Sequence, residues 1–124
     1  EPLPTLFILG TKDPINPYGG GEVNGARSSE RDASTVLSAR RSAGYFARGN
    51  ACRAEPKRKV LRSPRGKVIG DRDKYKRCGK GRVELLSLPM GHKWPLAGTP
   101  MAKRGASATI AEFLKKRVWR KRLR

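Results

Sequence analysis

The sequence predicts an α/β fold in which strands and helices alternate along the chain. Two short, continuously apolar segments, TLFILG (5–10) and RVELLSL (82–88), have the pattern of strands buried in a parallel sheet. Each is followed by a turn-rich loop and then by a segment with helical character. The expected order is strand, loop, helix, a long polar excursion, strand, loop and helix, which is α/β organisation.

The first strand ends at Gly10, and the loop TKDPINPYGGG (11–21) is rich in turn-forming residues. Asp13 therefore lies just past the carboxyl end of this strand. A helix is expected over about residues 30–47, because Ser29 with Asp32 fits a helix N-cap followed by an acidic residue three positions on. Gly44 weakens the second half of this helix.

Residues 50–82 are polar, basic and rich in Gly and Pro, so they are expected to contain at most short strands. The strand RVELLSL then leads into GHKWPLAGTP (91–100), which contains the only histidine, His92. From about Ala106, apolar residues at helical spacing predict a terminal amphipathic helix. These residues are Ile110, Phe113, Leu114 and Val118.

The charge of the chain is strongly positive, at +19, because 29 Lys and Arg outnumber 10 Asp and Glu. Such a charge suggests a polyanionic partner, or simply a solvated basic surface, and charge alone does not choose between them. The terminal KKRVWRKRLR (115–124), with Trp119 interleaved, allows non-specific polyanion binding or is a solvated tail. No apolar run of about 18 residues occurs, so no transmembrane segment is expected.

Asp13 and His92 both follow strands, at the sheet edge where α/β proteins bind ligands. A carboxylate that orients an imidazole is two-thirds of a hydrolase triad, and the acid precedes the histidine as in α/β-hydrolases. If this pairing is real, the two side chains should converge within hydrogen-bond reach. The alternative is that Asp13 only forms a turn and that His92 is a solvated loop residue.

Three segments carry a resemblance to a known family: PTLFILGTKDPINPYGGGEV (4–23), YKRCGKGRVELLSLPMGHKWPLAG (75–98) and SATIAEFLKK (107–116). They resemble the acid loop, the Gly-His-x-Trp-Pro histidine segment and the closing helix of the polyhydroxybutyrate depolymerase and feruloyl esterase-like family of α/β-hydrolases. The similarity spans most of residues 2–117 in register and is weaker between about 53 and 70. The chain departs from the family pattern at ILGT and PMGH.

The resemblance implies the C-terminal portion of an α/β-hydrolase fold, with an incomplete sheet over residues 1–117 and a basic tail at 118–124. It makes Asp13 the triad acid and His92 the general base of a serine carboxylic ester hydrolase that acts on polyesters or aromatic esters without a cofactor or a metal. Trp94 and Pro95 would shape the rim of the substrate pocket, although Trp94 could instead merely shield the loop.

No Gly-x-Ser-x-Gly nucleophile motif occurs in the sequence. The expected protein is therefore a C-terminal fragment that lacks the nucleophile half and is inactive alone. Two alternatives remain open: a small basic nucleic-acid-binding protein, and a decayed or misassembled coding sequence.

Cys52 and Cys78 stand where the family often carries a cysteine pair, so the resemblance implies a disulfide between them. Such a bond favours a secreted or periplasmic location, whereas two free thiols would suit a reducing cytosol. Hydrophobic residues make up 36% of the chain, and a crosslink would support a core that is lean for this length.

Overall fold

The computed structural model describes residues 3–23, 35–93 and 105–122. The chain divides into two compact units, residues 1–93 and 94–124. Among the described residues, the first unit contains a four-stranded sheet, a two-stranded sheet and one helix, and the second unit contains one helix.

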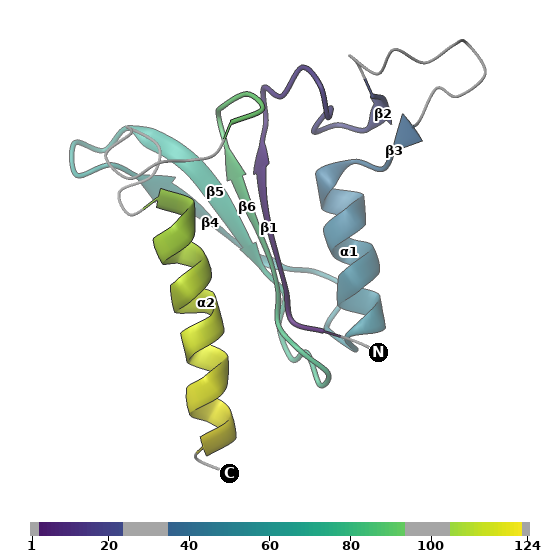
Figure 1. Ribbon diagram of the computed structural model, residues 1–124, viewed down its shortest axis with the longest axis vertical. Coiled ribbons are helices and arrows are strands. Elements are labelled where there is room, and N and C mark those ends of the chain that lie inside the picture. Colours follow the sequence, from purple (N-terminus) through teal and green to yellow (C-terminus); the bar gives the residue numbers. More distant parts are fainter. Residues whose placement is uncertain (1–2, 24–34, 94–104, 123–124) are drawn as a thin grey trace. The chain divides into compact units, whose positions relative to one another are not determined.

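The first unit contains a four-stranded mixed sheet in the order β1–β6–β5–β4 (Figure 1). Strands β1 (Thr5–Gly10) and β6 (Val83–Leu88) are parallel neighbours, with Thr5 opposite Val83 and Gly10 opposite Leu88. Every residue of β6 is buried, whereas β1 is partly buried and lies at the edge of the sheet. The two predicted strands and the α/β class are confirmed.

The polar excursion contains more sheet than predicted. Strands β4 (Lys57–Arg62) and β5 (Val68–Lys74) form an antiparallel hairpin, and β5 also pairs antiparallel with β6. The prediction of at most short strands was wrong, because β4 is exposed at five of its six positions and therefore shows no apolar pattern. Backbone pairing, which is independent of side-chain polarity, holds this hairpin on the sheet.

Helix α1 (Ala39–Gly49) packs its alanine face against one side of the sheet. Ala39 and Ala43 form the core cluster with Leu85 of β6. These small side chains let the helix backbone approach the sheet closely. Partly buried apolar and aromatic residues surround this cluster: Phe7, Leu9, Tyr18 and Tyr75.

Helix α1 begins later than predicted. Ser38 is its N-cap, and the Ser38 hydroxyl accepts a hydrogen bond from the Arg41 backbone N–H at 3.2 Å. Shortly before the N-cap, strand β3 (Thr35–Val36) pairs with β2 (Gly21–Glu22). The prediction of a helix from about residue 30 was therefore wrong for residues 35–38, which are not helical. Ser29 and Asp32 lie outside the described residues.

Two links join the β4–β5 hairpin to the segment around α1. A disulfide connects Cys52, just after the helix, to Cys78, which follows β5. The carboxylate of Asp73, on β5, is buried and accepts hydrogen bonds from Arg40 of α1 at 2.7 Å and from Arg58 of β4 at 2.7 and 3.1 Å. Helix and hairpin thus share one buried carboxylate, whose charge is balanced by two guanidinium groups.

The second unit contains helix α2 (Gly105–Arg122), so the predicted terminal helix is present. Its predicted apolar face is not confirmed, because Leu114 is 54% exposed. The helix continues into the segment 118–124, whose composition suggests a tail. Among the residues that the structure describes, no helix has the length and apolar character needed to cross a membrane.

Candidate functional site

The side chains of Asp13 and His92 meet at the carboxyl ends of β1 and β6. The Nδ1 atom of His92 lies 2.8 Å from Oδ2 of Asp13, although 79 residues separate them in the chain. Because β1 and β6 are parallel neighbours, the loops that follow them leave the sheet at the same edge. The structure therefore brings these two side chains together, within the distance expected from the sequence.

Backbone contacts hold the two loops against each other. The N–H of Thr11 donates to the Leu88 carbonyl at 2.8 Å, and the N–H of Lys12 donates to the Met90 carbonyl at 3.1 Å. A side chain at Gly10 would collide with the carbonyl oxygen of Met90, so this close approach requires glycine at the end of β1. The Gly10 that closes the apolar run is thus part of the geometry that places Asp13 beside His92.

The two oxygens of Asp13 have different partners. Oδ1 accepts hydrogen bonds from the backbone N–H groups of Ile15 at 2.8 Å and Asn16 at 2.9 Å, while Oδ2 faces His92. Asp13 therefore both forms a turn and pairs with the histidine, so the two interpretations of this residue are compatible. Desolvation by itself raises the pKa of Asp13, but hydrogen bonds from Asn16, His92 and Ile15 outweigh it and hold the pKa below 3.8.

The ionised carboxylate determines how His92 carries its proton. A carboxylate can only accept hydrogen bonds, so the His92 nitrogen that faces it, Nδ1, must be the donor. In the neutral imidazole the other nitrogen, Nε2, is then an acceptor. The His92 side chain is 57% exposed, whereas that of Asp13 is 8% exposed. Within the described part of the chain, the Asp13 carboxylate is the one group that hydrogen-bonds to this imidazole. The pair can therefore take a proton from a group that approaches Nε2.

A hollow of about 200 Å³ lies beside Asp13, between β1, its loop and the start of α1. Its walls are mostly apolar, with Asp13 and Ser42 among the polar groups. They are formed by Phe7, Leu9, Gly10, Asp13, Asn16, Pro17, Tyr18, Val36, Leu37, Ala39 and Ser42. The hollow therefore borders the acid rather than the histidine of the pair.

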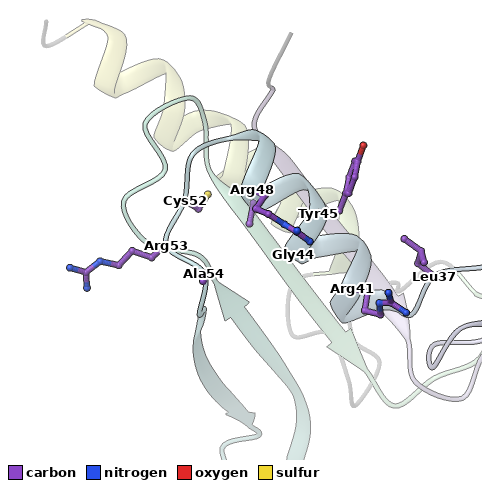
Figure 2. Close-up of a pocket in the computed structure, with 9 residues that line it drawn as sticks. Leu37, Arg41, Gly44, Tyr45, Arg48, Cys52, Arg53 and Ala54 are labelled. Atoms are coloured by element: carbon purple, nitrogen blue, oxygen red, sulfur yellow. The ribbon is translucent and has the colours of Figure 1, made fainter.

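A larger hollow of about 440 Å³ runs along α1 and contains neither Asp13 nor His92 (Figure 2). Three arginines, Arg41, Arg48 and Arg53, contribute to its walls, and no acidic residue does. The remaining wall residues are Leu37, Gly44, Tyr45, Ala47, Cys52 and Ala54. Its chemistry therefore suits an anion better than a cation.

Two predicted site residues, Trp94 and Pro95, lie outside the described residues. Among those described, no group of three or more His, Cys, Asp or Glu side chains could hold a metal ion. Tyr18 was not indicated by the sequence, yet its hydroxyl lies 2.7 Å from Oγ of Ser87. The available signal was Ser87 itself, a polar residue between leucines in a buried strand.

No family model, no curated protein and no solved structure matches this chain. The fold and the site together define an α/β domain with a carboxylate–imidazole pair at the carboxyl ends of two neighbouring parallel strands.

Proposed function

We propose that Asp13 and His92 are the acid and the general base of a catalytic triad in a serine carboxylic ester hydrolase. The observation that carries this proposal is the 2.8 Å contact between His92 Nδ1 and Asp13 Oδ2 at the carboxyl ends of two parallel strands. The order of acid before histidine and the flanking motifs support the polyhydroxybutyrate depolymerase and feruloyl esterase-like class. Polyesters and aromatic esters are the substrates that this resemblance suggests.

In the proposed reaction His92 transfers one proton in two steps, from the serine to the imidazole and then to the leaving group. Nε2 of His92 accepts the proton of the serine hydroxyl as the serine oxygen attacks the ester carbonyl, and the resulting imidazolium then gives that proton to the leaving alcohol. The carboxylate of Asp13 orients the ring and stabilises the imidazolium. Because hydrogen bonds lower the pKa of Asp13, the carboxylate stays ionised and does not take the proton itself.

We assign the nucleophile to a segment outside these 124 residues, at the end of a further strand of the same parallel sheet. Within the described residues β1 pairs with β6 alone, so its other edge can accept a further strand. In α/β-hydrolases the nucleophile precedes the acid in the chain. A parallel strand of this sheet that carries Gly-x-Ser-x-Gly at its carboxyl end would present its serine at the same edge as Asp13 and His92.

The test joins this chain to the polypeptide encoded directly upstream of it in its natural DNA. We expect the longer protein to hydrolyse p-nitrophenyl butyrate and the 124-residue chain to remain at background. In the longer protein, Asp13→Asn should lower kcat about 10,000-fold because the imidazole then adopts the wrong tautomer. Glu55→Gln, which removes an exposed carboxylate away from the pair, is the matched control and should keep full activity.

Two results would contradict the proposal. One is an upstream segment without a Gly-x-Ser-x-Gly motif. The other is a longer protein whose ester hydrolysis survives Asp13→Asn or His92→Ala. Activity of the 124-residue chain alone would reassign the nucleophile to a residue within it.

A second candidate function, binding of nucleic acid through the surface of α1, is favoured by the larger hollow. Within the described part of the chain, none of its three arginines forms an ion pair, and the Tyr45 ring beside them is 66% exposed. Cationic groups that follow a backbone, together with exposed aromatic rings on which bases stack, are typical of single-strand binding.

The salt dependence of oligonucleotide binding tests this second function. For a fluorescent single-stranded oligonucleotide, Arg41→Gln with Arg48→Gln should make the slope of log K against log salt less negative by about 1.4, because two phosphate contacts are lost. Lys59→Gln with Lys67→Gln removes the same charge from the β4–β5 hairpin and should leave the slope close to its original value. Equal effects of the two double variants would mean that general cationic charge, and not this hollow, binds the oligonucleotide.

A further inference from the structure

The buried hydroxyl of Ser87 has its hydrogen-bond partner in the loop that carries Asp13. Ser87 lies in β6 and is 1% exposed, so it needs a partner inside the protein. Tyr18, five residues after Asp13, provides it, with 2.7 Å between the Tyr18 hydroxyl and Ser87 Oγ. The bond therefore links the loop of the acid to the strand that leads to the histidine.

The same loop is held at both of its ends. At its start, the N–H of Thr11 donates to the Leu88 carbonyl, one residue beyond Ser87. At its end, the Tyr18 carbonyl accepts the N–H of Ala39, the first residue of α1, at 2.8 Å. The Tyr18 ring packs against the core cluster, and the Arg40 guanidinium lies 6.0 Å from its centroid. Tyr18 is thus the point at which the loop contacts core, helix and strand together.

The contact between Asp13 and His92 is too exposed to order this loop by itself. A hydrogen-bonded pair with a largely solvated partner contributes little net free energy, because water competes for both groups. The relative position of the two side chains must therefore be fixed by the surrounding structure. Here that structure is the loop of Asp13, which is held by Thr11 and Tyr18.

We infer that Tyr18 and Ser87 are positioning residues, whose mutual hydrogen bond keeps the Asp13 carboxylate within reach of His92. The effect of this positioning on catalysis rests on the proposed function. The placement of the Asp13 carboxylate beside His92 does not depend on that function. Tyr18 is assigned no contact with the substrate, so its effect reaches the reaction only through Asp13.

A double variant separates positioning from simple structural support. Tyr18→Phe alone leaves the Ser87 hydroxyl buried without a partner, which lowers stability for a trivial reason. Tyr18→Phe combined with Ser87→Ala removes both polar groups, so we expect the denaturant midpoint to return close to that of the unsubstituted chain. The link between loop and strand stays absent in this double variant.

His92 reports the outcome directly because it is the only histidine in the chain. Long-range ¹H–¹⁵N correlation at about pH 8, where an ordinary imidazole is neutral, shows which ring nitrogen carries the proton. We expect the Nδ1–H form in the unsubstituted 124-residue chain and a shift toward a solvent-like tautomer mixture in the double variant. Tyr45→Phe, which removes an exposed tyrosine hydroxyl, is the matched control and should leave the tautomer unchanged.

Asp13→Asn separates failure of this inference from failure of the proposed function. If Asp13→Asn shifts the His92 tautomer and the double variant does not, Tyr18 and Ser87 have no positioning role and the inference is overturned. If Asp13→Asn itself causes no shift, the acid–histidine pair is absent in solution and both ideas fail. In the longer protein, the double variant should lower kcat about 10- to 100-fold with KM unchanged, the effect of a displaced catalytic group.

Discussion

The disulfide is expected to supply a large part of the stability of the first unit. Cys52 and Cys78 close a loop with a sequence separation of 26, and the β4–β5 hairpin lies inside that loop. The hairpin buries few apolar side chains, since β4 is exposed at five of six positions. Replacing both cysteines by serine removes the crosslink and exchanges only the sulfur of each side chain for oxygen.

The size of the effect follows from the length of the closed loop. In the chain-entropy model, a separation of 26 residues restricts the unfolded chain by about 12 cal/mol/K, which corresponds to about 3.5 kcal/mol at room temperature. This is a large fraction of the 5–15 kcal/mol that typically stabilises a small domain. Beside the crosslink, the Arg53 N–H donates a hydrogen bond to the Lys76 carbonyl at 2.8 Å. This single hydrogen bond contributes too little free energy to replace the disulfide.

Urea unfolding of the unsubstituted chain and of Cys52→Ser with Cys78→Ser, each with and without reductant, measures this difference. We expect reductant to lower the unfolding free energy of the unsubstituted chain by about 3.5 kcal/mol and to have no effect on the double variant. A difference below about 1 kcal/mol would refute the reasoning, because the loop would then be ordered without the crosslink.

Two further predictions concern the β5–β6 contact and the acid. Gly70 has φ +142° and its added Cβ would lie 2.5 Å from the Ser87 carbonyl oxygen, so Gly70→Ala should cost about 3 kcal/mol or more in urea unfolding. Gly66→Ala, at φ +83° with open space around it, should cost only about 1 kcal/mol, and equal losses would contradict the steric argument. The folded pKa of Asp13 is lower than its ordinary value of 3.8, so the stability it contributes is complete above that value and is lost as pH falls through the folded pKa. Unfolding measured from about pH 6 to about pH 2 should therefore show a flatter acid limb in Asp13→Asn, and identical acid limbs would argue against the pairing.

The sequence by itself determined the elements that have a strong apolar signal. The continuous apolar runs at 5–10 and 83–88 indicate β1 and β6, and apolar residues at helical spacing indicate the terminal helix. It also placed Asp13 and His92 just after strands. Their meeting was predictable because parallel neighbours bring their carboxyl ends to one edge.

Tertiary structure alone decided the rest. The β4–β5 hairpin is held by backbone pairing, which leaves polar side chains free to vary, so its sequence has no strand periodicity. Helix α1 begins at Ala39 because Thr35 and Val36 pair with residues 21–22, a contact that local propensity does not encode. The bond from Tyr18 to Ser87 spans 69 residues, and in a linear sequence neither hydroxyl indicates its partner. Partners of this kind are selected by the fold, because only the packed chain brings a buried polar group to the one neighbour that can satisfy it.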